Sequence, residues 1–287
     1  MSLRRTALLS VPLALALAAC APAEDEATEP AGDATPAADA CTTDGLPVKT
    51  AGTLTVATDS PAYEPWFSED DPSNGRGYES AVAYAVAEKL GFAEDEVTWV
   101  KVPFNNSYAP GAKEFDFDIN QISITPERAE VVDFSRPYYT ASQAVITLAE
   151  NADQAGSLAD LKSLKLGAQT GTTSLTAVRE QVKPTAEPLV FNDTNAAKQA
   201  LLNGQVDGIV ADLPTAFYIS AVEIEGSAIT GQFETAGQAD EFGLLFEKGN
   251  PLRTCVDQVL ADLEADGTLA DIEQEWLSDV VDVPVLK

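Results

Sequence analysis

The chain of 287 residues contains no histidine, one methionine and three cysteines. Without histidine, the Ser-His and Cys-His pairs of nucleophilic enzymes and the histidine sites of zinc enzymes are excluded, together with the usual general base near neutral pH. The GxGxxG fingerprint of dinucleotide-binding proteins does not occur either. The sequence therefore argues against hydrolases and zinc enzymes, and it predicts neither a metal nor a cofactor.

Basic residues are also scarce. Lys and Arg total 17 against 46 Asp and Glu, which gives a formal net charge of -29. Nucleic acids and anionic lipid surfaces would be repelled by such a charge. Since 45% of the residues are hydrophobic and 22% are charged, the chain can fold around a proper core as one large or two modest domains. We expect an acidic globular protein that binds no nucleic acid.

The first 20 residues, MSLRRTALLSVPLALALAAC, have the pattern of an export signal, with two arginines, a short apolar run and small residues before Cys20. The apolar run is too short for a comfortable membrane span. The letters LAAC resemble a bacterial lipobox, which implies that residues 1–19 are a cleaved signal peptide and that Cys20 is lipidated. An ordinary signal peptide with a chance cysteine is the alternative.

The segment that follows is rich in Ala, Pro, Asp, Glu and Thr and has no aromatic residue. Such a segment cannot bury enough apolar surface to offset the entropy of ordering it. We therefore expect residues 20–50 to be a disordered tether between the lipid and the folded domain.

Two cysteines remain, Cys41 before the first predicted strand and Cys255 near the C-terminus. An even pair of cysteines in an exported chain indicates a disulfide, which here would close almost the entire domain. Two free buried thiols are the alternative.

From Gly52 onward, short strand-like segments such as TLTVATD and VDGIVAD alternate with longer helix-like segments, the last of which covers residues 250–276. This alternation predicts βαβ units and mostly parallel sheets. Ligands of open α/β sheets bind beyond the carboxyl ends of the strands. The polar residues that follow predicted strands are Asp59, Ser123, Thr125, residues 170–173 and Asp212.

One of these strands leads into TPER, which predicts a helix with Arg128 in its first turn. A cation is unfavourable at the positive end of the helix dipole unless an anion lies nearby. The hydroxyl groups of Ser123 and Thr125, just upstream, suit an anion site. A surface arginine that pairs with Glu127 or Glu130 is the alternative.

Five consecutive segments, TLTVATDSPAYEPWF, GYESAVAYAVAEKLG, ISITPERAEVVDFSRPYY, LGAQTGTTS and VDGIVADLP, resemble motifs of the extracytoplasmic amino-acid-binding proteins of ABC importers, polar amino acid family. The resemblance covers nearly all of residues 52–287, and the block SITPERAxxVDFSxPYY is its most specific part. It implies an α/β fold, a two-lobed clamp of the type II periplasmic-binding-protein class with mostly parallel sheets flanked by helices. It also implies a binding protein without catalysis of its own.

The same resemblance implies a domain organisation and a set of partners. Lobe 1 would consist of residues 51–142 plus 238–287 and lobe 2 of residues 143–237, with crossings near residues 138–145 and 232–242. The protein would be a monomer, anchored by lipid to the outer face of the cell membrane. It would capture a free amino acid and deliver it to the membrane permease of an ABC importer.

Each matching residue then acquires a role from the resemblance. Arg128 would hold the α-carboxylate of the ligand through a bidentate contact that lysine could not make. Asp212 matches the acceptor of the ligand's ammonium group, although a helix cap is the alternative. After Gly171, the N–H and hydroxyl groups of Thr172 and Thr173 would serve as donors, or as an ordinary cap.

The side chain of the ligand would meet a second group of residues. Tyr63 and Phe104 fall where the family stacks aromatic rings against the ligand, although most aromatic residues are core residues. Gln121 stands where many members carry a small residue, and Asp59 places an acid near the expected pocket, with Arg76 as the one basic candidate. A dicarboxylate would lack a partner there, which favours amino acids with polar or cationic side chains.

Two other functions fit the same fold. A prephenate or arogenate dehydratase-like enzyme would hold a carboxylated ring with the same arginine and use an acidic residue as general acid. A ligand-sensing ectodomain that signals to a kinase is the third hypothesis, and the lipobox argues against it. Binding of amino acids and an aromatization assay would distinguish the amino-acid-binding protein from the dehydratase-like enzyme.

Overall fold

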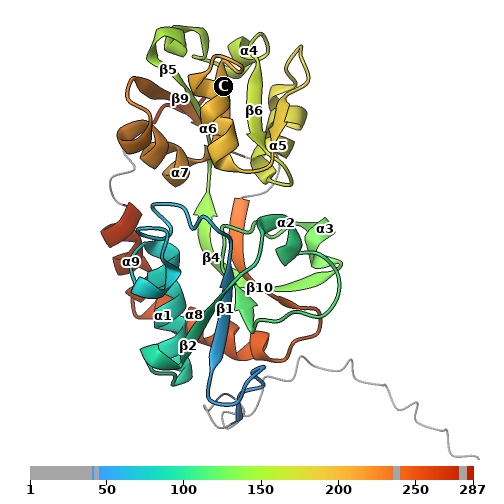
Figure 1. Ribbon diagram of the computed structural model, residues 1–287, viewed down its shortest axis with the longest axis vertical. Coiled ribbons are helices and arrows are strands. Elements are labelled where there is room, and N and C mark those ends of the chain that lie inside the picture. Colours follow the sequence, from blue (N-terminus) through green and yellow to red (C-terminus); the bar gives the residue numbers. More distant parts are fainter. Residues whose placement is uncertain (1–40, 42–44, 235–239, 278–282) are drawn as a thin grey trace, which may run out of the picture. The chain divides into compact units, whose positions relative to one another are not determined.

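The computed structural model describes residues 41, 45–234, 240–277 and 283–287 (Figure 1). The predicted signal peptide, Cys20, most of the tether and part of the second crossing lie outside these residues. The described residues all belong to one compact unit. Among the described helices, none is both long enough and apolar enough to cross a membrane.

The first lobe is built on a five-stranded sheet in the order β2-β1-β3-β10-β4. Its strands are β1 (Leu54–Thr58), β2 (Val97–Lys101), β3 (Phe117–Asp118), β4 (Val132–Ala141) and β10 (Asp240–Glu247). Strand β1 is parallel to β2 and β3, whereas β10 is antiparallel to β3 and β4. The sequence LTVAT of β1 is buried throughout, as expected for a central parallel strand covered on both faces.

The second lobe has its own five-stranded sheet in the order β7-β6-β8-β5-β9. Its strands are β5 (Gln143–Leu148), β6 (Leu166–Gln169), β7 (Leu189–Phe191), β8 (Gly208–Asp212) and β9 (Ser227–Phe233). Strand β6 is parallel to β7 and β8, and β5 is antiparallel to β8 and β9. The α/β two-lobed class is confirmed, but both sheets are mixed rather than mostly parallel. The antiparallel pairings all involve β5 or β10, the strands that follow the two crossings.

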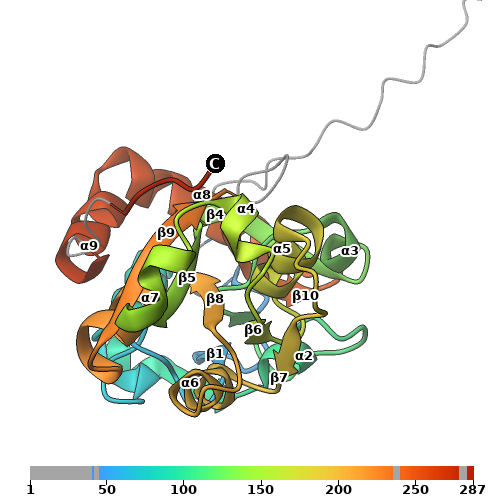
Figure 2. The ribbon, with the colours of Figure 1, turned by 90° about the horizontal axis from the view of Figure 1, so that it is seen from above.

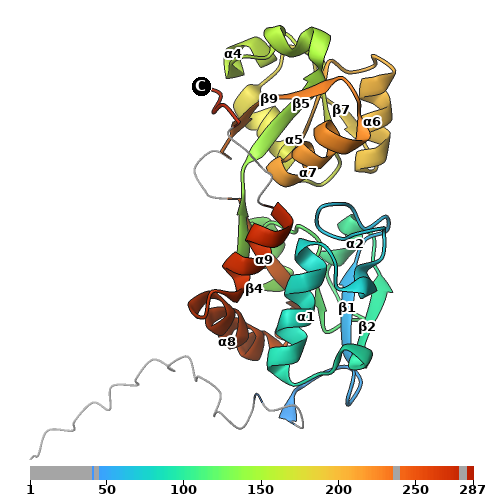
Figure 3. The ribbon, with the colours of Figure 1, turned by 90° about the vertical axis from the view of Figure 1, so that its left-hand side faces the viewer.

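Helices cover both sheets. In the first lobe, α1 (Tyr78–Leu90) packs against α8 (Leu252–Ala265) and α9 (Thr268–Leu277) beside the sheet (Figure 3). The single helix predicted over residues 250–276 is thus two helices, because Gly267 between them has a left-handed backbone with φ 87°. The short helices α2 (Phe104–Ser107) and α3 (Pro126–Ala129) follow β2 and β3.

In the second lobe, the helices divide between the two faces of the sheet (Figure 2). Neighbouring residues of β5 point to opposite faces, so that Val145 packs in the cluster with α4 (Leu158–Leu161) and α5 (Thr173–Ala177). Ile146 packs in the cluster with α6 (Thr194–Leu202) and α7 (Leu213–Tyr218). Asp193 caps α6 by accepting a hydrogen bond from the backbone N–H of Ala196.

The polypeptide passes from the first sheet to the second at Ser142, between β4 and β5. The last residues of the chain depart from the predicted division into lobes. Leu286 is 5% exposed within a core cluster of the second lobe. Its N–H donates to the carbonyl oxygen of Gln232 in β9, and the N–H of Gln232 donates to the carbonyl oxygen of Pro284. Residues 283–287 therefore pack on the second lobe, although they were predicted in the first.

The predicted disulfide is present. Cys41 and Cys255 are joined, with an S–S distance of 2.02 Å and a sequence separation of 214. The bond connects the segment before β1 to α8, within the core of the first lobe. The alternative of two free thiols is thereby excluded.

Candidate functional site

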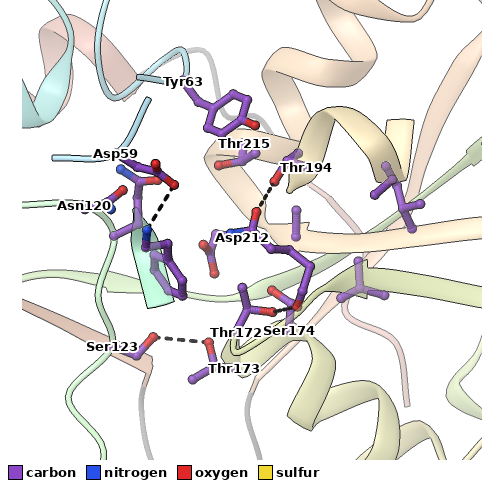
Figure 4. Close-up of a pocket in the computed structure, with 17 residues that line it drawn as sticks. Asp59, Tyr63, Asn120, Ser123, Thr172, Thr173, Ser174, Thr194, Asp212 and Thr215 are labelled. Carbon is purple, nitrogen blue, oxygen red and sulfur yellow. Dashed lines mark hydrogen bonds between the residues drawn. The ribbon is translucent and has the colours of Figure 1, made fainter. Parts of the chain in front are cut away.

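A pocket lies between the two lobes, where strands of both sheets end. Asp59 follows β1, while Gln169 and Asp212 are the last residues of β6 and β8. Residues of the first lobe and of the second face each other across it (Figure 4). This is the position beyond the carboxyl ends of strands at which open α/β sheets bind ligands.

All of the predicted ligand-binding residues except Thr125 and Arg128 belong to the wall of this pocket. Those that do are Asp59, Tyr63, Phe104, Gln121, Ser123, Thr172, Thr173 and Asp212. The wall also includes polar residues that the sequence did not single out, which are Asn120, Gln169, Ser174, Thr194 and Thr215. The contact of each predicted residue with a ligand stays a prediction.

Arg128 lies just behind the pocket wall and connects the lobes. Its Nη1 donates to the carbonyl oxygen of Ser123 at 2.7 Å, and its Nη2 donates to the carbonyl oxygen of Gly171, in the second lobe, at 2.8 Å. Thr125 is the N-cap of α3, and its hydroxyl accepts from the backbone N–H of Arg128. Because Arg128 is only 7% exposed, burial lowers the pKa of its guanidinium.

Two aromatic rings cover the guanidinium group of Arg128. Its central carbon lies 4.6 Å from the ring centre of Tyr108 and 5.5 Å from that of Phe104, within the range of cation–π contacts. The ion pairs found among the described residues do not include Arg128. The arginine is therefore not the exposed partner of Glu127 or Glu130 that the sequence left open.

Gly171 occupies the point where the second lobe meets α2. Its backbone is left-handed, with φ 75°. A Cβ atom at this position would overlap the Asn105 Oδ1 and Tyr108 hydroxyl atoms. Glycine is thus favoured here by its left-handed backbone, and a Cβ atom would also force the ends of the Asn105 and Tyr108 side chains to move.

Asp212 ends β8 and points its side chain toward the pocket (Figure 4). It is the N-cap residue of α7 by position, but its carboxylate makes no capping hydrogen bond. Instead, Oδ1 accepts a hydrogen bond from Nε2 of Gln143 at 2.8 Å. Burial, and next the charge of Asp240, raise the pKa of Asp212. Asp212 is therefore not a simple helix cap.

A line of hydrogen bonds runs from the pocket to the strands that cross between the lobes. The hydroxyl groups of Ser123 and Thr173 lie 3.2 Å apart. Thr173 donates to Oδ2 of Asp240 at 2.9 Å, and Gln143 Nε2 donates to the same oxygen at 2.7 Å. Asp240 and Gln143 were not predicted from the sequence, where their only signal is that each is a polar residue at the start of a largely buried strand.

Gln121 lines the pocket in an unusual conformation, with φ 48°. Its backbone N–H donates to Glu79 Oε1 at 2.7 Å, and its side-chain amide donates to Glu79 Oε2. Tyr138 donates its hydroxyl hydrogen to Glu79 as well. Burial raises the pKa of Glu79 to about 7, while these donors act in the opposite direction. Gln121 thus belongs to the pocket wall with its amide nitrogen bound to Glu79.

The part of the pocket assigned to the ligand's side chain contains Asp59, Tyr63 and Phe104. Asp59 accepts hydrogen bonds from the N–H groups of Ser60 at 2.6 Å and Phe104 at 3.2 Å. Burial raises the pKa of Asp59. The Nζ atom of Lys198 lies 5.7 Å from the ring centre of Tyr63, and it also forms an ion pair with Glu223 at 2.7 Å.

Asn120 is a further polar residue at the pocket, and its Nδ2 is buried without a hydrogen-bond partner among the described residues. A buried donor of this kind gains from a ligand acceptor. Within the described part of the chain, no cluster of three or more Cys, Asp or Glu side chains could hold a metal ion.

Curated relatives align with most of the chain. The L-cystine-binding protein TcyJ of Escherichia coli (strain K12) is 28% identical over 231 residues, which is 80% of this chain and 84% of the relative. The L-cystine-binding protein TcyA of Bacillus subtilis (strain 168) is 30% identical over 242 residues, 82% of this chain and 84% of the relative. The similarity thus spans the whole folded part rather than a single motif.

Solved structures agree with the fold. An ancestral arginine-binding protein bound to arginine matches with a TM-score of 0.67 and 33% identity, over 79% of this chain and 98% of that chain. An ancestral amino-acid-binding protein, described as a precursor of cyclohexadienyl dehydratase, matches with a TM-score of 0.67 and 32% identity, over 78% and 95% of the two chains. The sequence profile of one family matches residues 54–279, and the chain therefore belongs to the bacterial extracellular solute-binding proteins, family 3.

Proposed function

We propose that this protein captures a free amino acid outside the cytoplasm, between its two lobes, and delivers it to an ABC importer. The observation that carries the proposal is the pocket between the lobes, which has the carboxylate of Asp212 in its wall and the guanidinium of Arg128 directly behind Ser123. A zwitterion has one charge for each of these groups. The relatives are described as binding proteins for amino acids such as cystine, arginine and histidine, which supports the same conclusion.

The α-carboxylate of the ligand belongs near Arg128 in this proposal. A guanidinium has five N–H donors in a planar fork, and only two of the Arg128 nitrogens donate hydrogen bonds to carbonyl oxygens in this structure. A carboxylate can use the remaining donors or replace the carbonyl oxygen of Gly171. Ser123, Thr172 and Thr173 lie in the pocket wall beside it. The hydroxyl hydrogens of Thr172 and Thr173 already go to Gln169 and Asp240, so the neutral donors that these threonines would offer are their backbone N–H groups.

The ammonium group of the ligand belongs at Asp212. An ammonium group has three donors, and the amide oxygen of Gln121, a residue of the pocket wall, would be a second acceptor. A buried carboxylate is stabilised by a cationic partner, and a bound amino acid provides one.

The pocket favours ligands with polar or cationic side chains. Asp59 is its acidic residue near Tyr63 and Phe104. The cation that contacts the Tyr63 ring, Lys198, is already paired with Glu223, and Arg128, which contacts the Phe104 ring, is assigned to the α-carboxylate. A ligand with a second carboxylate would meet the carboxylate of Asp59 without a compensating charge, which disfavours aspartate and glutamate.

The cavity volume is about 60 Å³. Such a space holds only a few water molecules, each of which requires about 10–15 Å³. We infer that the lobes separate to admit an amino acid, because the Arg128–Gly171 and Trp66–Thr215 hydrogen bonds already bridge them in this structure. The movement of the lobes around residues 138–145 and 232–242 is part of the proposal.

The place of the protein in the cell follows from its N-terminal sequence and its family. We propose that residues 1–19 are removed and that Cys20 carries a lipid that holds a monomeric protein at the outer face of the cell membrane, where a permease receives the amino acid. In a bacterial host, Cys20→Ser should then shift the protein from the membrane fraction to the soluble fraction. A variant that stays in the membrane fraction would contradict the lipid anchor.

Calorimetry with the common amino acids tests the binding function. One or more of them should bind, and Asp212→Asn or Arg128→Met should weaken binding about thirtyfold to several thousandfold, because a buried unpaired charge costs about 2–5 kcal/mol. Arg179→Met is the matched control, since Arg179 is exposed and pairs with Glu187. Failure of every amino acid to bind would refute the proposal.

A further inference from the structure

Two carboxylates, Asp212 and Asp240, share one amide group near the pocket. Nε2 of Gln143 donates to Oδ1 of Asp212 at 2.8 Å and to Oδ2 of Asp240 at 2.7 Å. An amide nitrogen has two hydrogen atoms, and each carboxylate receives one. The two acceptor oxygens are thus separated by no more than about twice a hydrogen-bond length.

The charges that act on Asp212 within the described part of the chain are mostly negative. Asp240 is 5% exposed and also accepts a hydrogen bond from Thr173. The charged groups that act most strongly on Asp212 are Asp240 from β10, Glu79 from α1 and Arg128 from α3, and Asp212 in turn acts on Tyr139 from β4. Of these groups, Arg128 alone is a cation.

Burial in a site of low dielectric strengthens the repulsion between like charges. Asp240 does not belong to the pocket wall, so it reaches a ligand only through its neighbours. Its position at the start of β10, beside Gln143 at the start of β5, keeps its charge close to Asp212. When the pocket is empty, protonation of Asp212 removes the free-energy cost of burying a charged carboxylate. It also removes the repulsion between Asp212 and Asp240.

We propose that Asp240 is a positioning carboxylate of the ammonium-binding end, coupled to Asp212 through Gln143, so that the site releases a proton from Asp212 when an amino acid binds. The O–H bond of Asp212 breaks, its proton passes to solvent, and the carboxylate accepts a hydrogen bond from the intact ammonium group. The inference rests on the proposed role of Asp212 as the ammonium acceptor.

The sign of the pH dependence follows from linkage. The pKa of Asp212 is raised in the empty protein, by burial first and by Asp240 second, and a bound ammonium lowers it. Between the lower pKa of the complex and the raised pKa of the empty protein, binding releases up to about one proton. In that window the affinity rises with pH, by up to about tenfold per pH unit, and above it the affinity becomes independent of pH.

Titration calorimetry with L-arginine and L-glutamine, in buffers with different ionisation enthalpies, measures the released protons. The wild-type protein should release protons below the raised pKa of Asp212. Asp240→Asn keeps the shape of the side chain and should release clearly fewer protons with a flatter pH profile. Glu241→Gln is the matched control, because it removes one negative charge at the next residue of β10. This variant should behave like the wild-type protein.

Carboxyl-carbon NMR titration of the unliganded protein gives a second readout that needs no ligand. The titration of Asp212 should move to lower pH in Asp240→Asn and should not move in Glu241→Gln. Binding without proton release from about pH 5 to about pH 9, or equal release by Asp240→Asn and the wild-type protein, would overturn the inference and leave the binding function intact. If neither amino acid binds, the NMR shift still decides whether Asp240 acts on Asp212.

Discussion

Gly171→Ala should weaken ligand binding by preventing the last step of lobe closure. Gly171 carries the carbonyl oxygen that accepts from Arg128, and its Cα faces Asn105 and Tyr108 in the other lobe. A methyl group at this point overlaps the side chains of Asn105 and Tyr108 only when the lobes are together. The substitution therefore acts mainly on the closed form.

The magnitude has two parts. The left-handed backbone of Gly171, with φ 75°, costs a residue with a Cβ atom about 1–2 kcal/mol, and this cost is present in the open and the closed form alike. The overlap involves the ends of the Asn105 and Tyr108 side chains, which can shift, so it adds at most the overpacking cost of about 1–3 kcal/mol to the closed form alone. Only this second part reduces the affinity, by at most about 5-fold to about 150-fold.

A matched control separates the two parts. Gly204 also lies in the second lobe and has φ 66°, but a Cβ atom there would have no neighbour within 4 Å. Gly204→Ala should lower the unfolding temperature as Gly171→Ala does and leave the affinity unchanged. Calorimetry with the tightest-binding amino acid measures the affinity, and thermal unfolding without ligand measures the backbone cost.

The reasoning would be refuted if Gly171→Ala bound with wild-type affinity, or if both alanine variants lost affinity equally. In the first case, the bound state would not bring Gly171 as close to α2 as this structure does. In the second case, the loss would come from the backbone of the second lobe rather than from the contact between lobes.

Two other substitutions test contacts that hold the structure together. The indole N–H of Trp66 donates to the hydroxyl of Thr215 in the other lobe at 2.8 Å, so Thr215→Val should weaken binding by about 5-fold to about 150-fold through an unpaired buried donor, while Thr215→Ser should bind normally. Equal calorimetric affinities of the two variants would exclude this contact from the bound state. The double variant Cys41→Ser/Cys255→Ser should lose up to about 5 kcal/mol of unfolding free energy in urea and keep its affinity, because α8 is not part of the pocket wall. Unchanged stability would show that the disulfide does not restrict the unfolded chain.

Most of the fold was readable from local patterns. The alternation of strand-like and helix-like segments predicted the α/β class, and TPER predicted a helix start where Thr125 caps α3. The direction of β5 and β10 was not readable, because the same buried strand sequence fits parallel and antiparallel neighbours. The pairing of residues 283–287 with β9 was missed for a similar reason, since no local signal tells a terminal segment which lobe it joins.

Some residues of the candidate site were likewise predicted from the sequence, and others were not. Residues that follow strands, such as Asp59 and Asp212, were predicted because strand ends of one sheet meet at one edge. Gln143 and Glu79 were not predicted, because a buried polar side chain is explained only by its partners, which are distant in sequence. Arg128 was recognised from its unfavourable position at a helix start, but its contact with Gly171 depends on how the two lobes meet.

The contacts between the lobes are weak enough for the unliganded protein to open again. Arg128 holds the carbonyl oxygen of Gly171, and Trp66 holds the hydroxyl of Thr215. A hydrogen bond contributes a net of only about 0.5–1.5 kcal/mol, or about 1.5–3 kcal/mol when one partner is charged, because separated lobes regain bonds to water. A ligand shifts the equilibrium toward closure only by as much as it binds the closed form better than the open one. In the empty protein, the Gly171 carbonyl oxygen occupies Arg128 through a weaker hydrogen bond than a carboxylate would form. A ligand carboxylate can displace this carbonyl oxygen from Arg128. The stronger contact between the two charged groups then favours the closed form.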